Sequence, residues 1–192
     1  GGGGKTLALA ATMNNRGKIY ATDADIRRLA PIHDRLRRAH VKNVEVRSPR
    51  GREDVLADLQ EQADLVLVDA PCTGSGTWRR NPDAKWRLRP GSLEARIKDQ
   101  ASVLDRAARL VKQGGRIAYI TCSILPDEND GAVEAFLSRT DGFEVTDAHK
   151  YMQATPYSSL VDHMRFSKFG LQLTPLRTGT DGFYLSLLTK VF

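Results

Sequence analysis

The amino-acid sequence predicts an α/β fold with a doubly wound, mostly parallel sheet. Two observations carry this prediction: short apolar strand segments alternate with amphipathic helical segments, and the links between them are short. Parallel strands need crossover connections of about a dozen residues or more, usually helices, so this alternation favours parallel pairing. The length of 192 residues suits a single domain.

The first part of the chain is expected to form helices and strands in turn. A glycine run opens a helix at Lys5, and the helical stripe that begins at Ile26 should be kinked by Pro31. A continuous apolar run, typical of a strand covered on both faces, ends at Asp69. The expected strands cover 18–22, 44–46 and 63–68, and a further helix is expected over 54–62.

The second part repeats this alternation after a loop rich in glycine and proline over 70–90. A long helix with one apolar face follows the loop and should be stopped by Gly114 and Gly115. The expected strands cover 116–121, 143–145 and 183–188, and a helix introduced by Pro126 covers 127–138. The stretch 149–180 is the least regular, and we expect it to form a loop over the active site.

The chain opens on a glycine run, Gly1 to Gly4, followed by Lys5. Such a run at the start of a helix lets backbone N–H groups approach the polar end of a ligand. Loops of this kind normally follow a strand, so we expect the first strand of the sheet to be missing from this chain. A remnant of an expression tag is the alternative interpretation.

Composition excludes several classes of protein. No apolar run reaches the roughly 20 residues of a membrane-spanning helix. The two cysteines are too few for a disulfide scaffold or a four-thiolate metal site, so we expect a cytoplasmic protein without a metal. The net charge of +6 favours an anionic partner such as nucleic acid, with a solvated basic surface as the alternative.

Polar residues follow the predicted strands at the edge where open α/β sheets bind ligands. Asp23 is placed to accept hydrogen bonds from a ribose diol, which indicates a nucleoside-containing cofactor; the alternative is a helix-initiating aspartate. Cys72 and Cys122 follow two other strands, so the fold should bring them together. A thiolate suits attack on an electron-poor carbon such as C6 of a pyrimidine, and packing alone is the alternative.

Three segments carry a resemblance to a known family: Asp69–Gly76, Arg79–Trp86 and Thr121–Asn129. They resemble the Sun/Fmu family of RNA cytosine-C5 methyltransferases, and Gly3–Thr6 and Asp181–Tyr184 fit the same pattern. The resemblance covers nearly the whole chain. It implies a Rossmann-like class I methyltransferase domain over 1–192, without the family's N-terminal RNA-binding extension. The implied reaction transfers a methyl group from S-adenosylmethionine to cytosine C5 in RNA, by analogy ribosomal RNA, and leaves S-adenosylhomocysteine.

The resemblance also implies roles for individual residues. Cys122 would attack C6 of the cytosine, and Cys72 would assist loss of the C5 proton and release of the product. Asp69 would hydrogen-bond the cytosine edge or stabilise its protonated N3, and Lys5 would contact the base or help to hold the active site. The implied cofactor-binding residues are Gly1, Gly2, Gly3, Gly4, Lys5, Asp23, Asp25, Ser48 and Asp69.

Two departures from the family pattern concern the cofactor. Gly2 stands where the family usually has proline, which should leave the backbone donors of the loop in place. The third cofactor motif usually offers an acidic residue near the adenine, whereas this chain has Arg47 and Ser48 in that region. We therefore expect Ser48 or a backbone carbonyl to hold the adenine amino group.

A basic loop after Cys72 is the predicted RNA contact, and its residues are Arg79, Arg80, Lys85 and Trp86. Basic groups can hold phosphates while an indole packs on a base or ribose. The alternative for Trp86 is a place in the core. Chemistry on C5 and C6 needs access to both faces of the ring, so the target cytosine must be single-stranded or turned out of a helix.

Three other functions compete with this interpretation. A phosphate-binding NTPase would explain Gly4–Thr6 and the strand that ends at Asp69, but it leaves the two cysteine motifs unexplained. A DNA cytosine-C5 methyltransferase would use Cys72 as its nucleophile, so it would not need Cys122. A non-catalytic RNA-binding domain would bind RNA without the cofactor.

Overall fold

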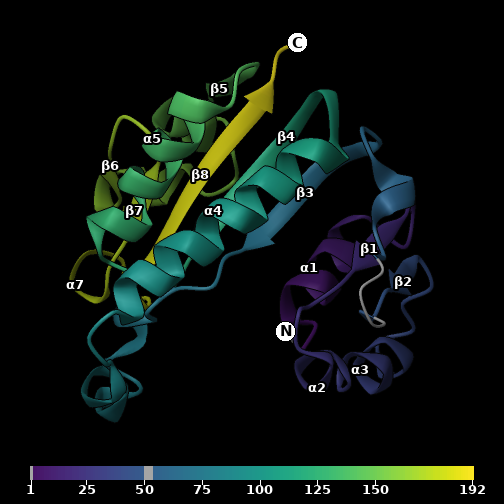
Figure 1. Cartoon of the computed structure of the whole chain (residues 1–192), viewed down its shortest axis with the longest axis horizontal. Helices are drawn as coiled ribbons and strands as arrows, with labels where there is room; N and C mark the ends of the chain where they lie inside the picture. The colour runs from purple at the N-terminus through teal and green to yellow at the C-terminus, as the bar shows by residue number, and fades with distance from the viewer. Residues whose placement is uncertain (1, 50–53) are drawn as a thin grey trace. The chain divides into compact units, whose positions relative to one another are not determined.

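The computed structural model describes residues 2–49 and 54–192, and the chain divides into two compact units, Gly1–Asp58 and Leu59–Phe192 (Figure 1). Each unit combines helices with strands and has at least one hydrophobic cluster of its own. The units are described separately below.

The first unit pairs two parallel strands and packs helices around them. Its elements are α1 (Gly4–Thr12), β1 (Ile19–Ala21), α2 (Ile26–Leu29), α3 (Ile32–Arg38) and β2 (Val44–Val46). β1 and β2 pair with Ile19 opposite Val44. The predicted break at Pro31 is confirmed, because this residue separates α2 from α3. The core of this unit consists of Ala21, Leu29, Ile32 and Leu36.

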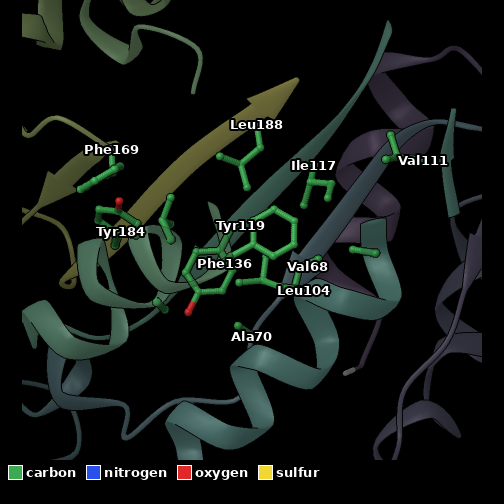
Figure 2. Close-up of a cluster of buried hydrophobic side chains, with 13 residues drawn as sticks. Val68, Ala70, Leu104, Val111, Ile117, Tyr119, Phe136, Phe169, Tyr184 and Leu188 are labelled. Atoms are coloured by element: carbon green, nitrogen blue, oxygen red, sulfur yellow. The ribbon is translucent and has the colours of Figure 1, made fainter. Parts of the chain in front are cut away.

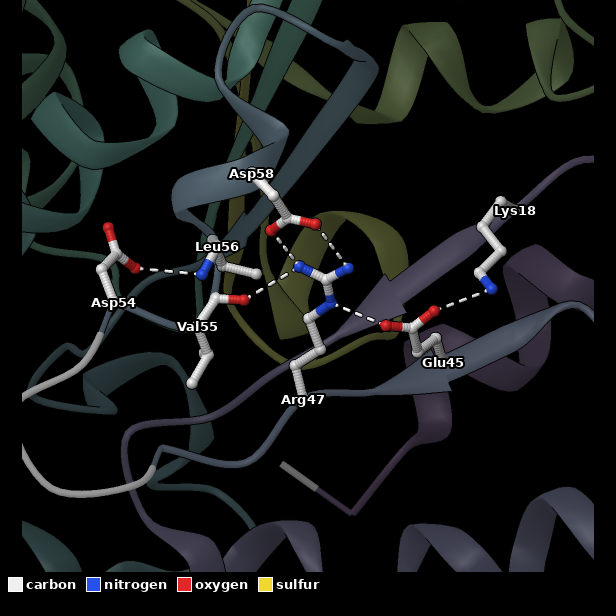
Figure 3. A network of polar contacts seen from close by, with 7 residues as sticks. All are labelled: Lys18, Glu45, Arg47, Asp54, Val55, Leu56 and Asp58. Carbon is white, nitrogen blue, oxygen red and sulfur yellow. Dashed lines mark hydrogen bonds and ion pairs between the residues drawn. The ribbon is translucent and has the colours of Figure 1, made fainter.

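Arg47 holds the end of β2 to the segment that follows it (Figure 3). Its guanidinium donates to the carboxylates of Glu45 and Asp58 and to the carbonyl of Val55. Glu45 also forms an ion pair with Lys18, with 2.8 Å between Lys18 Nζ and Glu45 Oε2. Arg47 stands in the region where the family usually has an acidic residue near the adenine. Its charge is engaged in contacts that hold this unit together.

The helix predicted over 54–62 is wrong, since only a short 3₁₀ turn, η1 (Ala57–Leu59), forms there. Asp54 accepts a hydrogen bond of 3.1 Å from the backbone N–H of Leu56, and Asp58 is bound by Arg47. Short aspartate side chains that bond nearby backbone groups compete with helix formation. These contacts outweigh the helix propensity of residues 54–62.

The second unit contains a six-stranded mixed sheet. Its strands are β3 (Ala63–Asp69), β4 (Val111–Thr121), β5 (Phe143–Val145), β6 (Arg165–Phe166), β7 (Leu171–Leu173) and β8 (Phe183–Lys190). The order is β3-β4-β8-β7-β6, and β5 also pairs with β8. β3 and β4 are parallel, whereas β8 runs antiparallel to its partners β4, β5 and β7. The α/β class is confirmed, and the sheet of this unit is mixed rather than mostly parallel.

The helices of this unit lie between and after these strands. They are η2 (Ser75–Thr77), η3 (Pro82–Arg87), α4 (Ser92–Leu110), η4 (Pro126–Glu128), α5 (Asp130–Arg139), α6 (Ala148–Gln153), η5 (Ser158–His163) and α7 (Pro175–Thr178). The predicted stop of the long helix at Gly114 and Gly115 is wrong. α4 ends at Leu110, and both glycines lie in β4, where its register with β3 shifts.

The stretch 149–180 is not an irregular loop, because it is built of short regular elements, and that it covers the active site stays a prediction. β7 pairs with β8 inside the sheet, and β6 pairs with β7. A separate cluster of buried side chains supports them, formed by Met152, Val161, Met164 and Leu171. Elements of two to six residues are too short to show a periodic pattern of hydrophobic residues, so the sequence alone does not reveal them.

The core of the second unit lies between its sheet and the helices α4 and α5 (Figure 2). Leu104 from α4, Phe136 from α5 and Tyr119 from β4 are each 0% exposed. Tyr119 meets Tyr184 of β8 edge to face, with ring centroids 6.4 Å apart. This packing fixes the positions of β3 and β4, on which the site described below depends.

Replacing Leu104 by alanine should lower the free energy of unfolding of the second unit by about 2–5 kcal/mol, because it leaves a cavity in the core. Both tryptophans of the chain, Trp78 and Trp86, lie in this unit, so urea unfolding followed by tryptophan fluorescence reports on it. Leu176→Ala is the matched control, since Leu176 is 95% exposed and its loss should change stability by less than about 0.5 kcal/mol. Equal effects of the two substitutions would contradict this assignment of the core.

Candidate active site

The two cysteines of the chain meet at one edge of the sheet of the second unit. β3 and β4 are parallel neighbours with Asp69 opposite Ile120, so both strands end at the same edge. The Sγ atoms of Cys72 and Cys122 lie 3.4 Å apart, within hydrogen-bonding distance for sulfur. Both are free thiols and both are half-buried. The expectation that the fold brings these cysteines together is confirmed.

The turn that carries Cys122 is held by buried polar side chains. Asn129 donates to the carbonyl oxygen of Ser123 at 3.0 Å and accepts a 2.6 Å hydrogen bond from Thr121. The hydroxyl groups of Ser75 and Ser123 lie 2.9 Å apart. All of these side chains are buried, so the backbone on both sides of Cys122 is fixed.

The turn that carries Cys72 is held by a second set of buried groups. Glu128 accepts hydrogen bonds from the backbone N–H of Thr73, at 2.8 Å, and from the hydroxyl of Thr73, at 2.5 Å. Gln100 of α4 donates to the carbonyl oxygen of Pro71, at 2.9 Å, and to Glu128, at 3.1 Å. The residues on either side of Cys72 are therefore both anchored.

Gly76 and Gly182 tie the start of β8 to the same edge. Gly76 donates its N–H to the carbonyl of Cys122, at 2.9 Å, and accepts a hydrogen bond of 2.8 Å from the N–H of Gly182. A Cβ atom at Gly76 would lie only 2.0 Å from the carbonyl oxygen of Gly182. This close approach of two backbones requires glycine and joins the Asp181–Tyr184 segment to the cysteine turns.

The contact between the thiols changes the proton affinity of both. The hydrogen bond from Cys122 lowers the pKa of Cys72 to about 7, against the opposing effect of burial. The hydrogen bond to Cys72, burial and the negative charges of Cys72 and Asp69 raise the pKa of Cys122. Near neutral pH the pair therefore begins to hold a single proton between its two sulfur atoms.

Asp69 and the predicted RNA contacts also belong to the second unit. Asp69 is the exposed last residue of β3, at the edge that carries the thiols. Trp86 is 79% exposed, so it is not a core residue, and Lys85 lies over its ring at 4.7 Å from the centroid. Arg80 forms an ion pair of 2.6 Å with Asp181, whose side chain is 9% exposed.

Arg79 lies at the limit of the same ion pair, 4.0 Å from Asp181. The sequence interpretation missed Asp181, because about a hundred residues separate it from the arginines. It also missed Glu128 and Gln100. Gln100 lies seven residues after Leu93 on the apolar face of a predicted helix, and a polar residue at such a position was the available signal.

The predicted cofactor residues other than Asp69 belong to the first unit, and Gly1 lies outside the described residues. Gly3 adopts the left-handed conformation, with φ of 88°, at the start of α1, which has no side-chain cap. The carbonyl of Gly2 accepts a 2.8 Å hydrogen bond from Arg35, and Lys5 lies in the first turn of α1. A Cβ atom at Gly4 would meet nothing within 4 Å, so the start of this helix is open.

The acidic candidates of the first unit differ in their contacts. Asp23 follows β1 and accepts a 2.8 Å hydrogen bond from the N–H of Asp25. Asp25 caps α2 by accepting from the N–H of Arg27 at 2.9 Å. Ser48 is half-buried just beyond the end of β2. Asp23 and Asp25 thus each accept a hydrogen bond from the backbone N–H two residues further along the chain.

The chain is similar to known proteins over nearly its whole length. A family model described as 16S rRNA methyltransferase RsmB/F matches residues 1–189. The chain belongs to this family. Membership of RsmB/F confirms the resemblance to Sun/Fmu proteins that the cysteine motifs indicated.

Individual relatives agree with this RsmB/F assignment. Ribosomal RNA small subunit methyltransferase B of Klebsiella pneumoniae (strain 342) is 35% identical over 188 residues, 98% of this chain and 40% of the relative. The crystal structure named PH0851 is 38% identical, with a TM-score of 0.85, over 97% of this chain and 40% of that one. NSun6 from Pyrococcus horikoshii with SFG is 28% identical, with a TM-score of 0.79, over 99% of this chain and 46% of that one.

The chain thus spans about 40% of the length of these curated relatives. The structural likeness confirms a Rossmann-like methyltransferase fold. Among the described residues, no helix is both long and apolar enough to cross a membrane. The described residues also contain no group of three histidine, cysteine or acidic side chains placed to hold a metal ion.

The thiol pair should lose its first proton near neutral pH. We expect alkylation of Cys72 by iodoacetamide to reach half its maximal rate near pH 7, measured by mass spectrometry of the labelled peptides. Cys122→Ala removes the hydrogen-bond donor and should move this midpoint up, toward the ordinary cysteine value of about 8.5. An unchanged midpoint in Cys122→Ala would contradict the proton shared between the sulfurs.

Proposed function

We propose that this chain is the catalytic domain of an S-adenosylmethionine-dependent methyltransferase that modifies C5 of a cytosine in ribosomal RNA through a covalent cysteine–C6 adduct. The observation that carries the proposal is the pair of thiols 3.4 Å apart at the carboxyl edge of the sheet in a member of the RsmB/F family. The similar proteins named ribosomal RNA small subunit methyltransferase B support the substrate class.

Cys122 is the proposed nucleophile. Its sulfur forms a bond to C6 of the cytosine, and the electron pair of the C5–C6 double bond makes C5 nucleophilic. Asp69 hydrogen-bonds the edge of the base or stabilises its protonated N3. After C5 has gained the methyl group, Cys72 accepts the proton that C5 loses, the C6–S bond breaks, and the sulfur of Cys122 leaves with its electron pair.

The contact between the thiols lowers the pKa of Cys72 and raises that of Cys122, so attack by Cys122 requires the shared proton to lie on Cys72. Removing Cys72 takes away the main cause that raises the pKa of Cys122. Cys122 therefore remains able to ionise and attack when Cys72 is absent.

The residues of the first unit fit a nucleoside cofactor. The uncapped start of α1 offers backbone N–H groups for a carboxylate, and Asp23 offers oxygens for ribose hydroxyl groups. Gly1, Gly2, Gly3 and Gly4 are the proposed cofactor-binding glycines, Lys5 contacts the base or holds the site, and Ser48 lies near the adenine. When bound, S-adenosylmethionine supplies the methyl group, and S-adenosylhomocysteine remains.

The basic loop after Cys72 is the proposed RNA contact. The exposed indole of Trp86 is free to stack on a base, and Lys85 beside it can bind a phosphate. Arg80 is paired with Asp181, and the exposed Arg79 lies within 4.0 Å of the same carboxylate, so both can turn toward an RNA phosphate. A ribosomal RNA substrate places the enzyme in the cytoplasm.

Substituting the two cysteines separately should give opposite defects. Cys122→Ala should abolish both methyl transfer and covalent capture of RNA, because no nucleophile remains. Cys72→Ala should accumulate a covalent protein–RNA adduct, because attack proceeds but the C5 proton is not removed. Denaturing gel shifts with labelled RNA and the cofactor measure both.

Two outcomes would contradict this division of roles. Free product at the normal rate from Cys72→Ala would exclude Cys72 from proton removal. Full activity of Cys122→Ala, with loss of activity in Cys72→Ala, would identify Cys72 as the nucleophile, as in DNA cytosine methyltransferases. A stable RNA complex without cofactor binding would favour a non-catalytic RNA-binding domain.

Asp23→Asn should weaken binding of S-adenosylhomocysteine about tenfold or more, measured by titration calorimetry, because a neutral amide replaces a charged acceptor of ribose hydroxyl groups. The amide oxygen can still accept from the N–H of Asp25, so the local fold should persist. Asp34→Asn on α3 is the control and should leave binding unchanged, since Asp34 is exposed and pairs with Arg37. Equal affinity of Asp23→Asn and the unsubstituted protein would exclude the proposed role of Asp23.

A further inference from the structure

Glu128 is a buried carboxylate that the reaction itself does not use. It is 0% exposed, and no lysine or arginine among the described residues of the second unit pairs with it. Burying a charge without a cation is costly unless hydrogen bonds compensate for the lost water. Three donors compensate here: the N–H and hydroxyl of Thr73 and the amide of Gln100.

The position of Gln100 costs free energy, because one of its buried polar atoms has no hydrogen-bond partner. Its amide nitrogen serves both Pro71 and Glu128, whereas its side-chain oxygen is buried without a hydrogen-bond partner. A simple packing residue at this position would be apolar, since an unpartnered buried oxygen costs free energy. The pair of Gln100 and Glu128 is thus specialised for holding the turn between Pro71 and Thr73.

The negative charge of Glu128 lies next to one thiol only. Its carboxylate binds Thr73, the neighbour of Cys72, while the turn of Cys122 is held by the neutral Asn129. Asp69 and Asp181 are further acidic groups at this edge: Asp69 is exposed, so water screens its charge more than that of Glu128, and Asp181 is paired with Arg80. The phenol of Tyr119, whose pKa is raised chiefly by burial, stays neutral and donates to the backbone carbonyl of Glu128.

We infer that Glu128 is a positioning residue that holds Cys72 against Cys122 and, by its buried negative charge, makes Cys72 a stronger proton acceptor. The inference rests on the proposed function, in which Cys72 takes up the proton of C5. The hydrogen bond from Cys122 is the main cause that lowers the pKa of Cys72; burial opposes it most, and the charge of Glu128 adds to that opposition. A proton acceptor loses strength as its pKa falls, so this opposition keeps Cys72 useful near neutral pH.

The test isolates Cys72 by using Cys122→Ala as the background, in which only one thiol remains to titrate. In that background Glu128→Gln should move the midpoint of Cys72 alkylation down by about half a pH unit, because a like charge is removed. A glutamine can keep the hydrogen bond from the N–H of Thr73, so the turn is preserved. Asp127→Asn, the same change at the exposed neighbouring residue, should leave the midpoint in place.

A purely structural role predicts a different result. Loosening the turn would leave the midpoint of Glu128→Gln where it is, or raise it, in protein whose circular dichroism shows it to be folded. That outcome would overturn the inference. If Glu128→Gln does not fold, Glu128→Met takes its place: it also removes the charge and should lower the midpoint, and an unchanged or raised midpoint would overturn the inference equally.

The titration needs neither RNA nor cofactor, so it separates this inference from the proposed function. A shifted midpoint in a protein that never methylates RNA would refute the function and keep the effect of Glu128 on Cys72. In an active enzyme with Cys122 intact, Glu128→Gln should increase the steady-state fraction of covalent protein–RNA adduct. No increase, together with an unshifted midpoint, would overturn the inference while the function stands.

Discussion

The parallel pairing of β3 with β4 is the constraint on which the chemistry of this chain depends. The register that sets Asp69 opposite Ile120 ends both strands at one edge, so the two turns that follow them lie side by side. Side chains alternate between the faces of a strand, so a shift of one residue would turn the buried Thr121 outward and the exposed Asp69 inward. The core formed by Leu104, Tyr119 and Phe136 fixes this register and, through it, the distance between the sulfur atoms.

The site is a buried polar network in which a different set of side chains supports each of the two cysteine turns. Thr121, Ser123 and Asn129 fix the turn of Cys122, whereas Gln100 and Glu128 fix the turn of Cys72. Such networks are stable only when their members are satisfied, because each lost partner leaves another polar group unpaired in a low dielectric. Rigid support of this kind lets two thiols share a proton without either turn moving.

The sequence predicted the edge but not what supports it. Apolar runs located β3 and β4, and the residues after them were therefore recognised as neighbours despite their separation in the chain. The hydrogen bonds of Glu128 to Thr73 and Gln100 join residues far apart in sequence, and only the folded packing specifies them. The same limit explains the failed helix over 54–62, where the guanidinium of Arg47 captures Asp58.

The acidic residues of the first unit show how local hydrogen bonds couple two candidates for the same role. Asp23 and Asp25 both follow β1 within four residues, and either fits a ribose-binding carboxylate by position. Asp25 is the N-cap of α2, a role in which aspartate is among the preferred residues, and its oxygen is taken by the N–H of Arg27. Its own N–H in turn orients Asp23. The two residues therefore depend on each other: Asp25 caps the start of α2, and its backbone N–H holds the carboxylate of Asp23 near the end of β1.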